Sequence, residues 1–203
     1  MKKFFFLFVA AAAVLSCAGG ANPAGVSFDD VIASRRSIRS FDATKTISEA
    51  DVRTLVASAQ EAPSWTNSQP SRYYVAMSAE KADAVREVIG DWNRRNTEGA
   101  HVFIVSTFVR GKSGFRANGE PANEVGEGWG AYDNGLSDAY LILKARAMGF
   151  DTLIMGGRDA AAIRGIFGIP EEETVMAVIA LGYRTANPER PARKPLDEVV
   201  KFF

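Results

Sequence analysis

Apolar residues recur at helical spacing in several stretches of this chain. The clearest stretch follows Ser48 and places four apolar residues on one side of a helix: Val52, Leu55, Val56 and Ala59. Ser48 followed three residues later by Asp51 is a capping box, which predicts the start of this helix, and Pro63 ends it. Ser27 and Asp30 form the same pattern and predict a shorter helix before it.

Helical and strand patterns mix irregularly along the rest of the chain. The run 132–148 ends at Gly149 and carries a set of residues on one helix face: Leu136, Ala139, Tyr140, Leu143 and Ala147. Other stretches predict helices over 79–90 and 159–167, and strands over 73–77, 101–109, 151–155 and 174–181. Because the two kinds of element do not alternate strictly, we expect an α+β layered fold.

One long segment shows no periodicity. Residues 110–128 are rich in Gly, Asn, Lys and Glu. A loop of this length inside a compact domain is more often a functional lid than a simple connection. Phe115 and Trp129 could line such a lid, although aromatic residues near a loop end are more often core anchors.

The N-terminus has the pattern of an export signal. Lys2 and Lys3 precede an apolar run from Phe4 to Leu15, and small residues follow it. The run is too short to span a bilayer, so it indicates a secretory signal peptide over 1–16 rather than a membrane helix.

A lipid anchor is the expected outcome of that signal. The residues 14–17, Val-Leu-Ser-Cys, resemble a bacterial lipobox, which predicts lipidation of Cys17; the alternative is a plain signal peptide cleaved a few residues later. We expect a lipidated cysteine and tether over 17–26 and a folded domain over 27–203. The protein is then exported and faces the periplasm or the cell surface from a bacterial membrane.

Composition narrows the function classes. A chain of 203 residues suffices for one domain, and 24 basic residues balance 24 acidic ones, which makes a nucleic-acid partner improbable. Cys17 is the only cysteine and His101 the only histidine. The sequence therefore predicts no internal disulfide, no metal site and no cysteine nucleophile, and it allows a serine hydrolase triad only with His101 as base.

Two basic clusters stand near the ends of the predicted domain. The first, residues 34–41, contains three arginines among serines and apolar residues. The second, residues 190–200, begins with Arg190, Arg193 and Lys194, with prolines among them. Guanidinium groups present fork-shaped donors that suit a phosphate or the oxygens of a flavin ring. The simpler interpretations are a solvated basic turn and a charged C-terminal arm.

Two uncharged clusters complete the candidate chemistry. The loop 62–70 is stiffened by two prolines, and the amides of Asn67 and Gln69 can both donate and accept hydrogen bonds, as the edge of a flavin or nucleobase requires. Gly156 and Gly157 end a predicted strand and allow a flat ring to approach the backbone closely. An ordinary helix-to-strand loop and a plain turn are the simpler interpretations.

Together and in this order, the four clusters resemble the nitroreductase family of FMN-dependent oxidoreductases. The likeness spans 28–203, and its most specific parts are the segments 35–41 and 62–70, with the tail 193–196 in support. The resemblance implies a nitroreductase-like layered fold, with a central, mainly antiparallel sheet flanked by helices. It also implies an intertwined homodimer with two FMN sites at the interface, on which the run 199–203 packs as an apolar arm.

The resemblance also implies roles for particular residues. One set would hold the phosphate, ribityl chain and pyrimidine edge of FMN: Arg35, Arg36, Ser37 and Arg39. Asn67 would reach the isoalloxazine ring from the partner subunit, with Gln69 in support, and Pro63 and Ser64 of the same loop would also belong to the cofactor site. Gly156 and Gly157 would donate backbone N–H groups near N5, and Arg193 would close on the phosphate with Lys194 beside it.

Two positions depart from the family pattern. Ser71 stands where an aromatic residue often follows the Gln-Pro pair, and Pro191 stands where a basic residue often precedes the tail arginine. The flavin supplies the redox chemistry in such enzymes, so no catalytic side chain is expected.

The expected activity is reduction of a small organic acceptor such as a nitroaromatic or a quinone. NAD(P)H is not expected outside the cytoplasm, so a redox protein or a quinone-linked reductase at the membrane is the expected donor. Two alternatives stay open: a lipoprotein that binds flavin or a similar ligand without turnover, and a surface lipoprotein whose basic clusters only form salt bridges.

Overall fold

The computed structural model describes residues 26–203 and contains one antiparallel sheet. The strand order is β1-β2-β4-β3, and every neighbouring pair is antiparallel. The strands are β1 (Ser71–Ala76), β2 (Val102–Val109), β3 (Asp151–Met155) and β4 (Glu173–Gly182). The expected α+β fold with an antiparallel sheet is confirmed, whereas the signal peptide, Cys17 and most of the tether lie outside the described residues.

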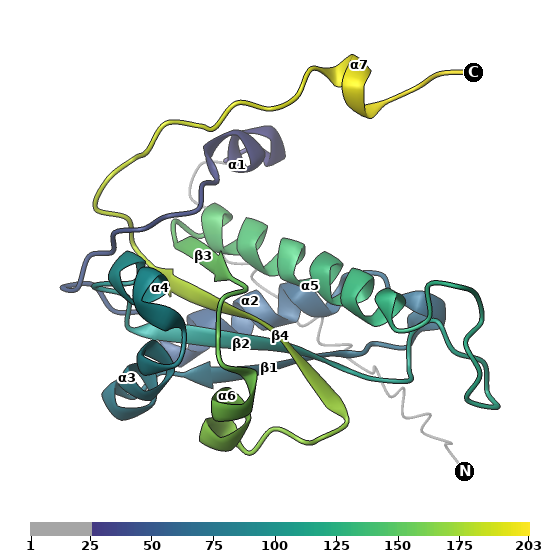
Figure 1. Ribbon diagram of the computed structural model, residues 1–203. Coiled ribbons are helices and arrows are strands. Elements are labelled where there is room, and N and C mark those ends of the chain that lie inside the picture. Colours follow the sequence, from purple (N-terminus) through teal and green to yellow (C-terminus); the bar gives the residue numbers. More distant parts are fainter. Residues whose placement is uncertain (1–25) are drawn as a thin grey trace, which may run out of the picture.

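Helices cover both faces of this sheet (Figure 1). One core packs α2 (Glu49–Gln60) and α5 (Gly128–Ala147) against apolar residues of β2 and β4, among them Ile104 and Ile179. The opposite core packs α3 (Ala79–Glu87) and α6 (Ala160–Phe167) against the other face, around Phe103 and Val178. Strands β2 and β4 are therefore buried on both sides, which explains why they are almost continuously apolar.

The two predicted capping boxes are present. The Ser27 hydroxyl accepts from Asp30 N–H at 3.1 Å and begins α1 (Phe28–Ser34). The Ser48 hydroxyl accepts from Asp51 N–H at 3.1 Å and begins α2. Each aspartate in turn accepts from the N–H of its serine, so local sequence alone fixes these helix starts.

The single helix predicted over 79–90 is wrong. The structure has α3 followed by a second helix, α4 (Gly90–Asn96). Gly90 adopts φ 76°, a left-handed conformation that interrupts α-helical geometry and lets the chain start a new helix in another direction. The short helix α4 places Asn93 and the exposed Trp92 at the end of the sheet near β3.

The long helix α5 differs from expectation in its start. It begins at Gly128, four residues before the predicted 132, although Gly128 and Gly130 are poor helix formers. Gly130 lies against the ring of Phe108, where a Cβ atom would come within 2.6 Å of ring carbon. Tertiary packing thus requires a glycine inside this helix and overrides its low helix propensity.

The buried face of α5 also differs from the prediction. The residues predicted to share one face do so, but none of them is fully buried, and Tyr140 is 42% exposed. The buried face lies opposite and consists mostly of polar side chains: Asp133, Asn134, Ser137, Asp138, Leu141 and Ala145. The helix therefore presents its more apolar face outward and its polar face to the sheet.

The strand predicted over 151–155 is observed with those bounds, and the remaining boundaries differ from expectation by at most two residues. The predicted strand over 73–77 runs from Ser71 to Ala76, and Asp159 caps α6 rather than belonging to it. After β4 the chain leaves the body as an extended tail that contains the short helix α7 (Leu196–Val199) near its end (Figure 1). None of the helices in residues 26–203 is long and apolar enough to cross a membrane.

Candidate functional site

The arginines of the first cluster lie at one end of the molecule, where the tail returns past α1. Burial lowers the pKa of the Arg36 guanidinium, and the nearby charges of Arg190, Arg184, Arg35 and Arg193 lower it further. Arg36 Nη1 donates to the carbonyls of Ala33 and Arg35 at 2.6 and 2.9 Å. The structure therefore brings two of the predicted clusters together, although they are more than 150 residues apart in sequence.

Few negative groups of the protein neutralise the charge of these arginines. Within residues 26–203, no carboxylate forms a salt bridge with any of five arginines: Arg35, Arg36, Arg39, Arg190 and Arg193. The Nε atom of Arg36 is buried and has no hydrogen-bond partner among the same residues. A buried donor without an acceptor is costly, so an anion such as a phosphate fits this position. We call these five residues the arginine group.

The neighbouring candidates are placed around it. Ser37 is exposed and pairs with Thr152 of β3, which joins the arginine segment to the sheet. Arg39 is exposed and donates only to the Ser37 carbonyl, at 3.3 Å. Lys194 lies 4.0 Å from Glu198 within the tail, so its charge is partly matched there. The charge of Arg190 lowers the pKa of Arg36 more than the charge of Arg193 does, although only Arg193 and Lys194 of that cluster were expected at the phosphate.

The amide loop, residues 64–69, has an unusual backbone. Thr66, Asn67 and Gln69 have φ values of 48°, 58° and 47°, in the left-handed region that side chains other than glycine rarely adopt. Each such residue costs on the order of 1 kcal/mol and persists only where the surroundings enforce it. The amides of Asn67 and Gln69 are exposed and contact each other at 3.2 Å.

A buried carboxylate enforces this loop conformation. Asp133 of α5 is 3% exposed and accepts from Trp65 N–H at 2.9 Å and from the Ser113 hydroxyl at 2.6 Å. Ser113 belongs to the long loop, residues 110–127, between β2 and α5. It contacts Ser68 at 2.7 Å, which fastens the long loop to the amide loop. The Ser64 hydroxyl accepts from Gln69 N–H at 3.0 Å, so in this chain Ser64 shapes the loop. Pro63 precedes it and restricts the approach of the backbone.

Aromatic residues line the same end of the molecule. The rings of Trp65 and Trp129 are 4.8 Å apart between centroids, and Trp129 and Tyr132 are 5.5 Å apart. Trp129 Nε1 donates to Asn123 at 2.9 Å, which holds the long loop against the start of α5. Tyr132 is 59% exposed, so the group offers a partly open aromatic surface beside the amide loop.

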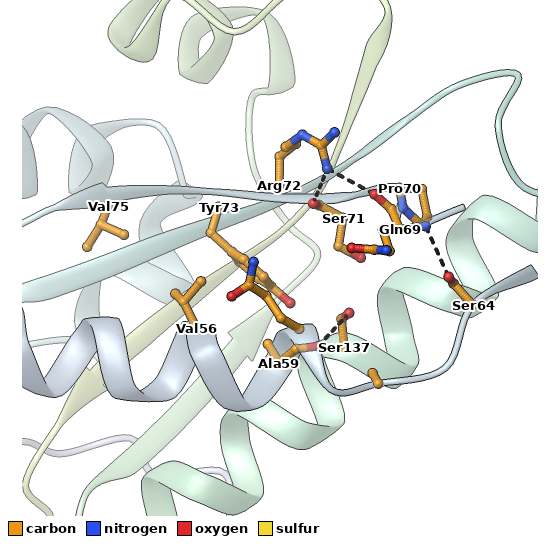
Figure 2. A pocket seen from close by; sticks show the side chains of 12 residues that line it. Val56, Ala59, Ser64, Gln69, Pro70, Ser71, Arg72, Tyr73, Val75 and Ser137 are labelled. Carbon is orange, nitrogen blue, oxygen red and sulfur yellow. Dashed lines mark hydrogen bonds between the residues drawn. The ribbon is translucent and has the colours of Figure 1, made fainter. Parts of the chain in front are cut away.

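A cavity of about 350 Å³ opens behind the amide loop. Figure 2 shows that α2 contributes Val56 and Ala59, α5 contributes Ser137, and β1 contributes Ser71 and Tyr73. Gln69 and Ser64 also belong to the lining, so the amide loop forms part of its wall.

A buried polar network lies beneath this cavity. Asp138 accepts from the Ser106 hydroxyl at 2.8 Å and from the Tyr73 hydroxyl at 3.1 Å. Asn134 donates to Ser106 at 2.9 Å and to Ser71 at 3.3 Å. Burial raises the pKa of Asp138 to about 6, and the two hydroxyl donors offset part of that rise. This network accounts for the polar buried face of α5.

The glycine pair forms a third feature at the end of β3. Gly156 and Gly157 are exposed, and their carbonyls accept from Arg158 Nη1 at 3.1 Å and from Asn93 Nδ2 at 2.8 Å. Ser37 pairs with Thr152, so the pair lies four residues along β3 from the arginine segment, about 13 Å. A ligand with a phosphate at one end and a ring at the other could contact both.

The arginine group and the amide loop do not meet within one chain. The arginine segment is connected through Arg184 to Asp151 and Arg146, near the C-terminal end of α5. The amide loop is bound to Asp133, near the N-terminal end of the same helix. Asp133 and Arg146 are separated by roughly 20 Å along the helix axis. Figure 1 shows the two ends of α5 on opposite sides of the molecule.

Comparison with known proteins identifies the family to which this chain belongs. A family model described as the nitroreductase family matches residues 32–183. The chain belongs to the nitroreductase family. Curated relatives of this nitroreductase-family chain include the NADH dehydrogenase of Thermus thermophilus, which is 26% identical over 82% of this chain and 91% of its own length.

Solved structures share the fold. A protein of Exiguobacterium sibiricum, determined in complex with FMN, superposes with a TM-score of 0.78 at 22% identity, covering 88% of this chain and 98% of its own. The NADPH:FMN oxidoreductase of Vibrio harveyi, determined with NAD⁺, superposes with a TM-score of 0.70 at 25% identity over 86% of this chain and 76% of its own.

Proposed function

We propose that this protein binds FMN between two copies of the chain and reduces a small planar organic acceptor, such as a nitroaromatic or a quinone. As a member of the nitroreductase family the chain is an FMN-dependent oxidoreductase. The observation that carries the proposal is the uncompensated arginine group, with the buried and unpartnered Arg36 Nε at its centre. No carboxylate in residues 26–203 forms a salt bridge with these five arginines. The phosphate of FMN would supply the missing negative charge.

Different residues would hold the phosphate, the ribityl chain and the ring of FMN. Arg35, Arg36 and Arg193, with Arg190, would hold the phosphate, while Ser37 and Arg39 would follow the ribityl chain toward the ring. Gly156 and Gly157 leave room for the ring at the end of β3, because both are exposed and carry no side chain. When bound, FMN supplies the hydride or electrons that pass to the acceptor. The arginines would stabilise negative charge that develops on the reduced cofactor.

The acceptor would stack against aromatic side chains. Trp65, Trp129 and Tyr132 form a partly exposed group next to Asn67 and Gln69. Aromatic faces bind planar rings by stacking, which favours nitroaromatics and quinones over flexible aliphatic acceptors. The long loop, held to the same group through Trp129, would exclude water from the reacting atoms.

A homodimer is the simplest way to join the two separated parts of the site. The amide loop and the arginine group stand at opposite ends of α5, so a second copy would bring the amide loop of one chain to the arginine group of the other. The outward face of α5 carries partly buried and exposed apolar residues suited to such an interface, including Leu136, Tyr140 and Leu143.

The tail would strengthen this dimer. Leu196, Val199, Phe202 and Phe203 are each at least 65% exposed, which is unfavourable for apolar side chains in water. Strand β1 is an edge of the sheet, and Val200 already has the extended backbone of a strand, at φ −128° and ψ 143°. The tail of one copy could therefore pack on the other copy, where its apolar residues would be covered.

The cellular location is part of the same proposal. We infer from the N-terminal pattern that the protein is exported and held to a bacterial membrane through a lipid on Cys17. The tether would then place the domain near membrane electron carriers, and a redox protein or a quinone-linked reductase would supply the electrons in place of NAD(P)H.

An absorbance spectrum and a mass measurement test the proposal together. The chain without residues 1–17 should copurify with one FMN per subunit as a dimer, bleach with dithionite and recover its colour with a nitroaromatic or a quinone. A colourless dimer that refuses added FMN would overturn the cofactor assignment. Bound FMN that no acceptor reoxidises would favour a flavin-binding lipoprotein without turnover.

A further inference from the structure

The turn made by Gly156 and Gly157 is held by side chains from outside β3. Asn93 Nδ2, on α4, donates to the Gly157 carbonyl at 2.8 Å and to the Ile89 carbonyl at 3.0 Å. Arg158 donates to the Gly156 carbonyl at 3.1 Å and to the Val175 carbonyl of β4. Both carbonyls of the glycine pair are thus oriented by side chains.

Fixing these carbonyls also fixes the N–H groups that follow them. In a trans peptide the C=O and the next N–H point in opposite directions. The Gly156 carbonyl points to Arg158 and the Gly157 carbonyl to Asn93, so the N–H groups of Gly157 and Arg158 point the other way. Neither N–H has an acceptor among residues 26–203, and the glycine pair is exposed. Two backbone donors at the end of β3 are therefore left without a partner in this part of the chain.

Asparagine is suited to this task for a chemical reason. Its amide nitrogen carries two hydrogens and can serve two carbonyl acceptors at once, as Asn93 does. The contact with the turn is close, because a Cβ atom on Gly157 would lie 3.2 Å from Asn93 Nδ2. Any side chain at 157 would press on the amide that orients the turn.

We propose that Asn93 is a positioning residue that aims the N–H group of Arg158 at N5 of the bound flavin, beside the N–H of Gly157 that the Arg158 side chain orients, and so sets the reduction potential of the flavin. The proposal rests on the proposed function. N5 of the oxidised ring accepts a hydrogen bond, whereas N5 of the reduced ring carries a hydrogen of its own. A fixed N–H donor at this place therefore favours the oxidised ring and makes the reduced ring a stronger hydride donor.

The test is the midpoint potential of the FMN-loaded dimer, measured by anaerobic titration against reference dyes. Asn93→Ala should raise the potential, shifting the equilibrium between oxidised and reduced flavin by up to tenfold, which is about 30 mV for a two-electron couple. Asn96→Ala is the matched control, because it makes the same change on the same helix without a bond to the turn. Asn93→Gln keeps both hydrogens and should recover part of the wild-type potential.

A second variant tests whether Asn93 acts through the turn. Gly157→Ala should raise the potential on its own, and adding Asn93→Ala to it should produce less than the sum of the two shifts. Gly157→Ala leaves the bond from Asn93 to Ile89 in place. An unchanged potential in FMN-loaded Gly157→Ala would therefore overturn the proposal even where Asn93→Ala does not fold.

The outcomes separate this proposal from the proposed function. Equal potentials and equal flavin absorbance bands in wild type, Asn93→Ala and Gly157→Ala, all with FMN bound, would overturn the role of Asn93 alone. Additive shifts in the double variant would also overturn it, because they would show that Asn93 acts elsewhere. A wild-type protein that binds no FMN would refute both proposals.

Discussion

The two parts of the candidate site are built on different physical terms. The arginine group gathers positive charge from the segment that follows α1 and from the distant tail, and few contacts other than backbone carbonyls hold its side chains. The amide loop carries no charge, and its strained backbone is fixed by the buried Asp133. A phosphate needs charge within a few ångströms, whereas a flat ring needs donors and acceptors in exact places. The arginine group can therefore function with mobile side chains, whereas the amide loop needs a rigid backbone.

Removing charge from the arginine group should have the largest effect. The double substitution Arg36→Ala and Arg193→Ala deletes two charge-assisted partners of a phosphate, each worth on the order of 2 kcal/mol. We expect the Kd for FMN to rise roughly a thousandfold. Fluorescence titration of FMN at low and high salt measures it, and the salt dependence should weaken with the substitutions.

The matched control for that experiment is Arg53→Ala. Arg53 is exposed on α2 and pairs only with Glu49, so its loss should leave FMN affinity unchanged. An unchanged Kd in the double arginine variant would contradict the assignment of the phosphate to this end of the molecule.

The conformation of the amide loop should depend on the buried acceptor Asp133, because the loop itself carries no charge. Asp133→Ala leaves Trp65 N–H and the Ser113 hydroxyl without their buried acceptor. We expect the free energy of unfolding to fall by roughly 3 kcal/mol, because each unsatisfied buried donor costs about 1 to 3 kcal/mol. Urea unfolding measures the change, and Asp133→Asn should cost less, since its amide oxygen can still accept. Equal losses in both variants would argue against this role.

The network beneath the cavity makes stability depend on pH. Burial raises the pKa of Asp138 to about 6, so between roughly pH 4 and pH 6 the unfolded chain loses this proton while the folded chain keeps it. The folded state then binds more protons, and stability falls as pH rises through that window, by about 2 to 3 kcal/mol. Below pH 4 the effect vanishes, because both states are protonated.

Asp138→Asn isolates that effect. The asparagine oxygen can still accept from Ser106 and Tyr73 but cannot ionise, so the decline between pH 4 and pH 6 should be smaller in this variant. Thermal unfolding across the pH range compares it with the wild type. The same slope in both proteins would show that another group is responsible.

The smallest expected effect is that of Thr66→Gly, which tests whether the amide loop must be rigid to bind FMN. Thr66 is β-branched and adopts φ 48°, so Thr66→Gly should relieve strain and stabilise the fold by about 1 kcal/mol. The same change frees the loop, so affinity for FMN should fall severalfold. Thermal unfolding and flavin titration on the same samples measure both, and a gain in stability with no loss of affinity would show that loop rigidity is unimportant.

Much of the fold was predictable because it depends on neighbouring residues. The capping boxes at Ser27 and Ser48 are formed by side chains three residues apart, and the strand over 151–155 was predicted with its observed bounds. The break at Gly90 was missed, because a single glycine inside a helical pattern is often tolerated. Local sequence does not reveal which glycine turns left-handed.

The site was predictable only in its parts. The arginine segment, the amides and the glycine pair were recognised by residue type and order, whereas Asp133 and Asn93 were missed. Arg190 was placed in the second basic cluster but was not assigned to the phosphate. Asp133 gave no signal, because a polar residue on a helix ordinarily faces solvent. It is buried here because the amide loop and Ser113 supply its hydrogen-bond partners from elsewhere in the chain.

The sequence by itself determined most of the elements, the family and the chemical character of the site, because each depends on residue type and short spacing. Tertiary structure alone decided three further matters: which face of α5 is buried, that the tail returns to Arg36, and that the two parts of the site stand apart in one chain. These depend on contacts between residues far apart in sequence, which no local pattern records.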